Sequence, residues 1–217
     1  MPELNPRAAA LSIPGIRVFS NQVQLFEDGV NLTIGQPDFP TPDSVKNAAI
    51  TAINNNKTGY SLNAGIVELR QAAADFFADK YNAHYTADEV VITNGASEAL
   101  DSVLRTILTE GDEVIITAPA YPAYESLIKL NGGVVKYHDV SDTEFIPNIE
   151  KLDALVTNST KAVLLNYPSN PTGASLSEKD VKDIANYIST KDLFLISDEI
   201  YSENVCENKH ISFGSME

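Results

Sequence analysis

The sequence predicts an α/β protein with a mostly parallel sheet that helices cover on both faces. Short β-branched or apolar runs alternate along the chain with stretches whose apolar residues recur every three or four positions. The expected strands are apolar throughout instead of alternating with polar residues, which is typical of strands buried on both faces. The chain has 217 residues, enough for one substantial core.

The first elements are two helices, a strand and a third helix. The triplet Thr41-Pro42-Asp43 places a cap and a first-turn proline before VKNAAITAINN, which predicts the start of a helix. Apolar residues at three- and four-residue steps between residues 69 and 77 predict a second helix. The β-branched run at residues 90–92 predicts a strand, and residues 96–107 have helical spacing.

The remainder of the chain continues this alternation. We expect four further strands, at residues 114–116, 134–137, 162–165 and 193–196. We expect helices between them, around residues 124–128, 149–157 and 181–188.

The composition excludes several classes of function. The net charge is −15 and the chain has only four arginines, which argues against a nucleic-acid-binding face. The single cysteine, Cys206, excludes a disulfide framework and a cysteine-based zinc cluster, and we expect no metal site. No apolar run approaches the length of a membrane span or a signal peptide, so we predict a cytoplasmic protein.

The residues that follow the strands are the candidate site, because ligands of parallel sheets bind outside the carboxyl ends of the strands. Four of the five expected strand ends carry unusual residues: TNGASEA, APAYPAY, NYPSNPTG and SDEIY. One pocket formed by four such loops is a more specific signal than any single motif.

Two of these ends are ambiguous when they are taken alone. Free N–H groups and the Ser97 hydroxyl at a helix start suit a phosphate, but this motif taken alone favours a plain strand–helix turn capped by Ser97. Tyr121 is placed to stack on a planar heterocycle, and covering the edge of the core is an equally good interpretation.

The other two ends favour a function. Pro168 and Pro171 constrain the residues before them, so that Asn170 presents its amide from a rigid loop. Asp198 follows an apolar strand and suits a protonated heterocycle nitrogen; a Walker B-like acid would need a P-loop that the sequence lacks, and a solvated acidic pair is the remaining alternative. A phosphate cradle, a stacking aromatic, a rigid amide and a carboxylate together describe a site for pyridoxal phosphate.

The sequence also resembles a known family from about Ile13 onward, the class I/II aminotransferases of the fold-type I pyridoxal phosphate enzymes. It is most similar to the branch with N-acetyl-diaminopimelate and aromatic aminotransferases. The segments that carry the resemblance are LTIGQPDFPTP, KTGYSLNAGIVELRQA, VVITNGASEAL, GDEVIITAPAYPAYE, NYPSNPTG and LISDEIY. The resemblance implies an N-terminal arm with a small-domain contribution at residues 1–40 and an incomplete cofactor-binding large domain at residues 41–217.

The resemblance assigns roles to cofactor-binding residues. It implies that Ala96 and Ser97 hold the phosphate and that Tyr121 stacks on the pyridine ring. It also implies that Asn170 and Tyr201 bond to the phenolic oxygen.

Three further roles follow from the same resemblance. Asp198 would pair with the ring nitrogen, and Gly35 would lie against the substrate carboxylate. Tyr60 would reach the phosphate of a partner's cofactor, which implies a homodimer with shared sites. Without the resemblance, Gly35 and Tyr60 are equally well a turn glycine and a core tyrosine.

One departure from the family is important for the chemistry. The family uses a lysine in a Ser-x-Ser-Lys-like motif to bind the cofactor covalently and to carry a proton, and none of the eleven lysines has that context. Lys209, the only lysine after Tyr201, lies in Glu-Asn-Lys-His. We therefore interpret the chain as the N-terminal portion of an aminotransferase that is inactive alone.

The aminotransferase interpretation has two alternatives. A carbon–sulfur β-lyase of the same fold shares all four strand-end motifs and would release pyruvate and ammonia. A non-catalytic remnant that binds pyridoxal phosphate without chemistry is the third possibility. The leading hypothesis is transfer of an amino group between an amino acid and a 2-oxo acid.

Overall fold

The computed structural model describes residues 2–12, 15–23, 25–30, 32–33, 35–205 and 209–216. Cys206 and Ile13 lie outside the described residues. The chain forms two compact units, one of Met1–Leu11 with Val67–Glu217 and the other of Ser12–Ile66. The division into residues 1–40 and 41–217 stays a prediction.

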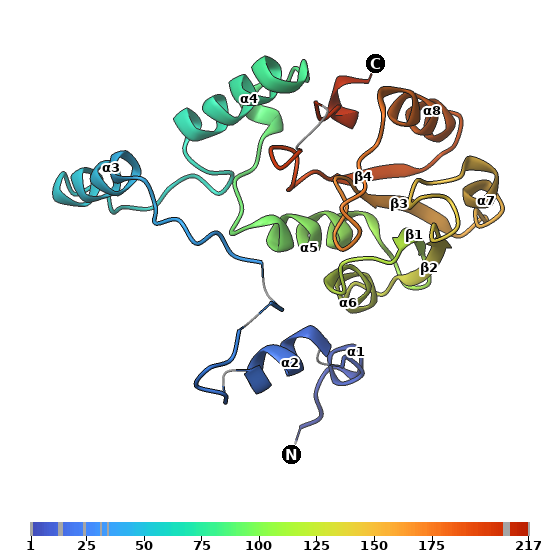
Figure 1. Ribbon diagram of the computed structural model, residues 1–217. Coiled ribbons are helices and arrows are strands. Elements are labelled where there is room, and N and C mark those ends of the chain that lie inside the picture. Colours follow the sequence, from blue (N-terminus) through green and yellow to red (C-terminus); the bar gives the residue numbers. More distant parts are fainter. Residues whose placement is uncertain are drawn as a thin grey trace. The chain divides into compact units, whose positions relative to one another are not determined.

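The larger unit contains a sheet of four parallel strands in the order β2-β1-β3-β4 (Figure 1). The strands are β1 (Glu113–Ala118), β2 (Val134–Asp139), β3 (Thr160–Asn166) and β4 (Phe194–Asp198). In the register of the sheet, Ile116 lies beside Tyr137 of β2 and Leu164 of β3. The predicted parallel α/β architecture is confirmed.

Helices cover the two faces of this sheet, because successive strand residues point to opposite sides. The helices α5 (Ala96–Ile107) and α6 (Ala123–Leu130) pack against Val114 and Ile116. Leu152 of α7 (Ile149–Asp153) and Ile184 of α8 (Glu178–Ser189) belong to a second core that contains Ile115. This second core also contains Val163 and Leu165 of β3.

Each unit contains further elements. The larger unit also contains α1 (Pro6–Ala9), α4 (Val67–Tyr81) and the short 3-10 helices η1 (Ala87–Glu89) and η2 (Phe213–Ser215). The smaller unit contains α2 (Gly15–Val23) and α3 (Asp43–Asn54). The sequence predicted a side-chain cap followed by a proline in the first turn of α3. This prediction is wrong in detail, because Pro42 occupies the N-cap position and no side chain caps the helix. Among the described residues, no helix has the length and apolarity that crossing a bilayer requires.

One predicted strand is wrong. Residues 90–92 pair with no strand in the described part of the chain, although the backbone of Val90 is extended, with φ −109° and ψ 130°. A β-branched run becomes a strand only where a neighbouring strand completes its hydrogen bonds. The Val91 side chain is 63% exposed, as expected for an extended segment without a neighbour on one side.

Candidate functional site

Asp198, the last residue of β4, lies at the centre of a hydrogen-bonded group at the carboxyl edge of the sheet. Its Oδ2 accepts a hydrogen bond of 2.7 Å from the Tyr124 hydroxyl, and its Oδ1 accepts one of 3.2 Å from the N–H of Ile200. Burial, followed by the charge of Asp198, raises the pKa of Tyr124 well above the ordinary value of 10.0. The phenol therefore keeps its proton and acts as a donor that orients the carboxylate.

The neighbouring strand β3 contributes further residues to the hydrogen-bonded group around Asp198. Asn166 ends β3, and its Nδ2 donates to the backbone oxygen of Asp198 at 2.9 Å. The Asn166 Oδ1 accepts a bond of 2.8 Å from the N–H of Asn170. The Asn170 Nδ2 in turn lies 3.4 Å from the hydroxyl of Tyr201, to which it donates. Three predicted residues, Asn170, Asp198 and Tyr201, are thus joined through Asn166.

Tyr121 lies beside this group. Its ring meets the ring of Tyr124 edge to face, with the centroids 5.4 Å apart and the planes at 80°. Tyr124 belongs to the first turn of α6, so the helix start fixes both rings next to the end of β4. Tyr121 is half-buried and keeps part of its surface open to solvent.

Ala96 and Ser97 are the first two residues of α5, and both are exposed. Gly95 precedes them with φ +80°, and no side chain caps the helix. A Cβ at Gly95 would meet nothing within 4 Å, so the space in front of this helix start is open. A short connection joins α5 to the amino end of β1, which directs the start of α5 toward the carboxyl edge of the sheet.

The groups at this edge fit pyridoxal phosphate. Uncapped N–H groups at the start of α5 are donors for a phosphate, and the helix dipole favours its negative charge. The Asp198 carboxylate suits a protonated nitrogen, and the donors of Asn170 and Tyr201 suit a phenolic oxygen. In the described part of the chain, no group of three or more His, Cys, Asp or Glu side chains could hold a metal ion.

Gly35 and Tyr60 belong to the smaller unit, Ser12–Ile66. Both are exposed, and a Cβ at Gly35 would meet no atom within 4 Å. The interpretation of Tyr60 as a core residue of this unit is therefore wrong. The proposed contacts of Gly35 and Tyr60 with a substrate and a partner stay predictions.

Two residues of the group were not predicted as site residues, Tyr124 and Asn166. The sequence contained a signal for each. Tyr124 follows Tyr121 by three positions, which is nearly one helical turn. Asn166 is a polar residue that directly follows the apolar run 162–165. In the structure it is only 4% exposed, so its side chain requires hydrogen-bond partners.

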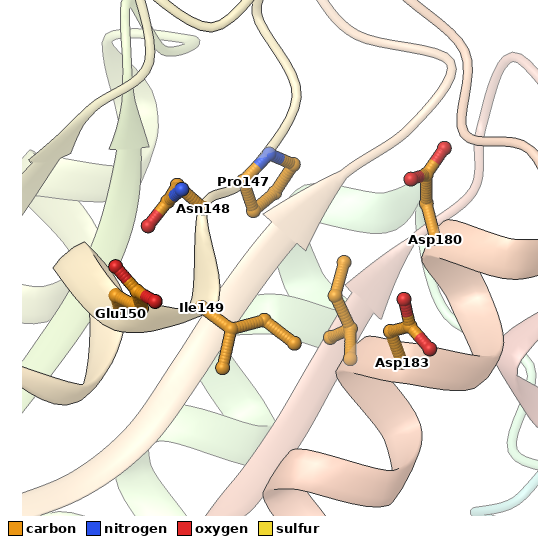
Figure 2. A pocket seen from close by; sticks show the side chains of 7 residues that line it. Pro147, Asn148, Ile149, Glu150, Asp180 and Asp183 are labelled. Carbon is orange, nitrogen blue, oxygen red and sulfur yellow. The ribbon is translucent and has the colours of Figure 1, made fainter.

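A separate pocket of about 340 Å³ lies between the starts of α7 and α8 (Figure 2). Ile149 and Ile184 form its apolar part, and Glu150, Asp180 and Asp183 stand around it. The Asp180 carboxylate accepts bonds from the N–H and hydroxyl of Ser177, at 2.9 Å and 2.6 Å, in the capping box of α8. None of the predicted site residues lines this pocket.

Comparison of the sequence with known families gives a match over most of the chain. The family described as "Aminotransferase class I and II" matches residues 27–215. A curated relative, "Probable N-acetyl-LL-diaminopimelate aminotransferase" from Bacillus subtilis, is 46% identical over 213 residues. That alignment covers 98% of this chain and 54% of the relative, so the chain spans about half the length of the curated relatives it matches.

Solved structures give the same result. Aspartate aminotransferase from Thermus thermophilus with maleate superimposes with a TM-score of 0.92 at 34% identity, over 99% of this chain and 58% of that one. Aromatic aminotransferase from Pyrococcus horikoshii superimposes with a TM-score of 0.84 at 34% identity, over 91% and 54% of the two chains. The predicted resemblance in sequence and fold is confirmed.

Proposed function

The chain belongs to the class I and II aminotransferase family, and from this premise we propose that it forms the cofactor-binding part of a pyridoxal phosphate-dependent aminotransferase. Such an enzyme transfers an amino group from an amino acid to a 2-oxo acid. The observation that carries the proposal is the group of Tyr124, Asp198, Asn166, Asn170 and Tyr201 at the carboxyl edge of the sheet. When bound, pyridoxal phosphate supplies a ring that accepts electrons from the substrate α-carbon.

Asp198 has the central role in this proposal. Its carboxylate would favour a proton on the ring nitrogen of the cofactor, since a nearby negative charge favours the protonated form of the ring. Tyr124 and the N–H of Ile200 occupy the other directions around the carboxylate, at 2.7 Å and 3.2 Å. These two bonds fix the orientation of the carboxylate before the cofactor arrives, which lowers the cost of binding.

The other predicted residues hold the remaining parts of the cofactor. Asn170 and Tyr201 would bond to the phenolic oxygen, and Tyr121, whose ring lies beside Tyr124, would stack on the pyridine ring. The N–H groups of Ala96 and Ser97 at the start of α5 would receive the phosphate. Different elements would thus hold the two ends of the cofactor.

By the family pattern, a lysine moves the substrate proton. None of the lysines of this chain lies in a Ser-x-Ser-Lys-like context, and the described ion pairs join lysines to acids outside the Asp198 group, such as Lys80 to Glu203 and Lys191 to Asp153. Because proton transfer needs a positioned acid or base, we propose that the 217-residue chain binds the cofactor without turnover.

A turnover assay tests this part of the proposal. The purified chain is supplied with pyridoxal phosphate, a panel of amino acids and a 2-oxo acid, and the formation of the second amino acid is followed. We expect none above the rate of the free cofactor. Transamination that co-purifies with the chain and disappears in Asp198→Asn would contradict the proposal of inactivity, and release of pyruvate and ammonia would favour the β-lyase.

We also propose that the whole protein is a homodimer in which Tyr60 reaches the cofactor of the partner. The support is the high exposure of apolar and aromatic side chains in the smaller unit, among them Phe19, Phe39 and Tyr60. Sedimentation velocity at several concentrations tests the association, and Tyr60→Phe should weaken cofactor binding only in the associated form. Binding that is independent of both association and Tyr60 would overturn this proposal.

A further inference from the structure

Glu199 directly follows Asp198, but its side chain bonds to a different part of the chain. Its Oε2 lies 2.8 Å from Nε2 of His210. Its Oε1 accepts bonds from the hydroxyl of Ser197 at 2.8 Å and from the N–H of Phe213 at 3.0 Å. The side chains of Glu199 and His210 are only 11% and 8% exposed. We call Glu199, His210, Ser197, Ser212 and Phe213 the Glu199 cluster.

The Glu199 cluster connects to the end of α4. The ring of His210 meets the ring of Tyr81 edge to face, with the centroids 5.4 Å apart. The Tyr81 hydroxyl donates to Glu203 at 2.7 Å, and Glu203 also pairs with Lys80 at 3.0 Å. The segment after β4, the end of α4 and residues 210–213 are therefore joined by a ring contact, by half-buried hydrogen bonds and by the exposed Lys80–Glu203 pair.

The charge of Glu199 is stabilised within this cluster. Burial alone would raise the pKa of its carboxyl, but hydrogen bonds from His210, Ser197, Ser212 and the N–H of Phe213 outweigh burial and lower the pKa below the ordinary value of 4.5. The carboxylate is therefore ionised at neutral pH. A buried charge with several charge-assisted bonds is costly to displace, so it fixes the backbone that carries it.

That backbone lies between two residues of the candidate site. Asp198 and Tyr201 flank Glu199 and Ile200, and the Ile200 side chain is 63% exposed. Of the two intervening side chains, only that of Glu199 is thus anchored in the interior. The backbone oxygen of Glu199 also accepts a bond of 2.9 Å from the N–H of Ser202, just beyond Tyr201.

We propose that the Glu199–His210 pair is a positioning device that fixes Asp198 and Tyr201 for the ring end of the cofactor without touching the cofactor itself. The proposal rests on the function proposed above, because it assigns the ring of pyridoxal phosphate to those two residues. It assigns no role to the pair at the phosphate end, where Ala96 and Ser97 start α5.

The test compares three variants of the full 217-residue chain. Glu199→Ala removes the charge and all acceptors, whereas Glu199→Gln keeps an oxygen acceptor for Phe213 and an amide that can face His210. Glu113→Ala is the matched control. Glu113 is 14% exposed and accepts a hydrogen bond of 2.7 Å from Thr157. It is the first residue of β1 and therefore lies at the amino ends of the strands, away from the carboxyl ends that carry the candidate site.

The first readout is cofactor affinity. We expect Glu199→Ala to raise the dissociation constant for pyridoxal phosphate about tenfold, and Glu199→Gln by less than about threefold. Glu113→Ala should change affinity by less than about twofold, although both alanine variants lower the melting temperature. Equal affinity in Glu199→Ala and wild type, or an equal loss in Glu113→Ala, would overturn the proposal.

A second readout is the absorbance of the bound cofactor as a function of pH. A displaced Asp198 no longer favours the protonated ring, so Glu199→Ala should move the midpoint of the ring titration to lower pH. Loss of stability alone would leave this midpoint in place, and an unchanged midpoint would count against the positioning role.

Amide hydrogen exchange separates failure of this inference from failure of the proposed function. If the wild-type chain binds no pyridoxal phosphate, the proposed function is wrong. Amide hydrogen exchange still shows in that case whether the Glu199–His210 pair fixes the backbone of residues 198–202. Faster exchange at residues 198–202 in Glu199→Ala than in Glu113→Ala would support the fixing of Asp198 and Tyr201. Equal exchange in the two variants would overturn it.

Discussion

The hydroxyl of Tyr124 is the group that most directly controls the orientation of Asp198. It lies 2.7 Å from Oδ2, is fully buried and keeps its proton because burial and the neighbouring carboxylate raise its pKa. A hydrogen bond to a charged group stabilises by about 1.5–3 kcal/mol, which is enough to hold a carboxylate in one rotamer. In the proposed function, Tyr124 would therefore act on the cofactor through Asp198.

Tyr124→Phe removes this hydroxyl and leaves the ring in place. We expect the variant to bind pyridoxal phosphate about three- to tenfold more weakly, because Asp198 must then be oriented during binding. Tyr187→Phe is the control, since Tyr187 also donates to an aspartate at 2.7 Å, Asp153, but on the surface of α8. Isothermal titration of both variants makes the comparison. Equal affinities would show that Tyr124 does not prepare Asp198.

Individual residues of the site were predictable to different degrees. Asp198 and Asn170 could be predicted as candidate site residues from the sequence. Asp198 lies at a strand end, and two prolines constrain the backbone around Asn170. For Tyr124 the sequence held only the three-residue spacing from Tyr121, because its role depends on a contact between two elements 74 positions apart in the chain. The cradle at Ser97 was ambiguous, because a capped turn and a phosphate site use the same residue types.

At the scale of elements, residues 90–92 test how a strand depends on its neighbours. Their β-branched composition equals that of residues 114–116, yet only the latter are paired on both sides and buried. Intrinsic preference for the strand conformation is about 1 kcal/mol at most and does not replace a missing neighbour. The four other strands were predicted correctly because each has a paired neighbour and contributes apolar side chains to one of the two cores.

Replacing a valine by threonine should affect the free energy of unfolding differently in residues 90–92 and in residues 114–116. Val91→Thr should change the free energy of unfolding by less than about 0.5 kcal/mol, since Val91 is 63% exposed. Val114→Thr should cost about 1–3 kcal/mol, because Val114 is fully buried and its replacement buries a hydroxyl. Urea denaturation of both variants measures the difference. A large loss in Val91→Thr would mean that residues 90–92 are covered in solution.

At the scale of the whole molecule, several titratable groups make stability depend on pH. Burial lowers the pKa of His138 below its ordinary value of 6.5, and its Nε2 accepts a bond of 3.1 Å from the N–H of Asn148. The unfolded chain therefore takes up this proton at a higher pH than the folded chain does. Glu199 and Glu113 make stability depend on pH in the same direction, around pH 4.5, because hydrogen bonds lower the pKa of both carboxyls in the folded state.

The free energy of unfolding should accordingly fall as the pH is lowered, first below about pH 6.5 and then further below about pH 4.5. His138→Gln keeps an acceptor for Asn148 and should remove the first part of this decline. His84→Gln, at an exposed histidine, is the control. Chemical denaturation at a series of pH values measures the slopes, and the same slope in His138→Gln and wild type near pH 6 would contradict the assignment.

The proposed function requires that the carboxyl edge of this sheet binds pyridoxal phosphate. The most direct measurement is the equilibrium binding of pyridoxal phosphate to the 217-residue chain and to Asp198→Asn, with circular dichroism to establish that both are folded. We expect saturable binding at one site per chain, weakened at least about tenfold in Asp198→Asn because the amide cannot balance a protonated ring. Absence of saturable binding by the folded wild-type chain, or equal affinity in Asp198→Asn, would contradict the claim.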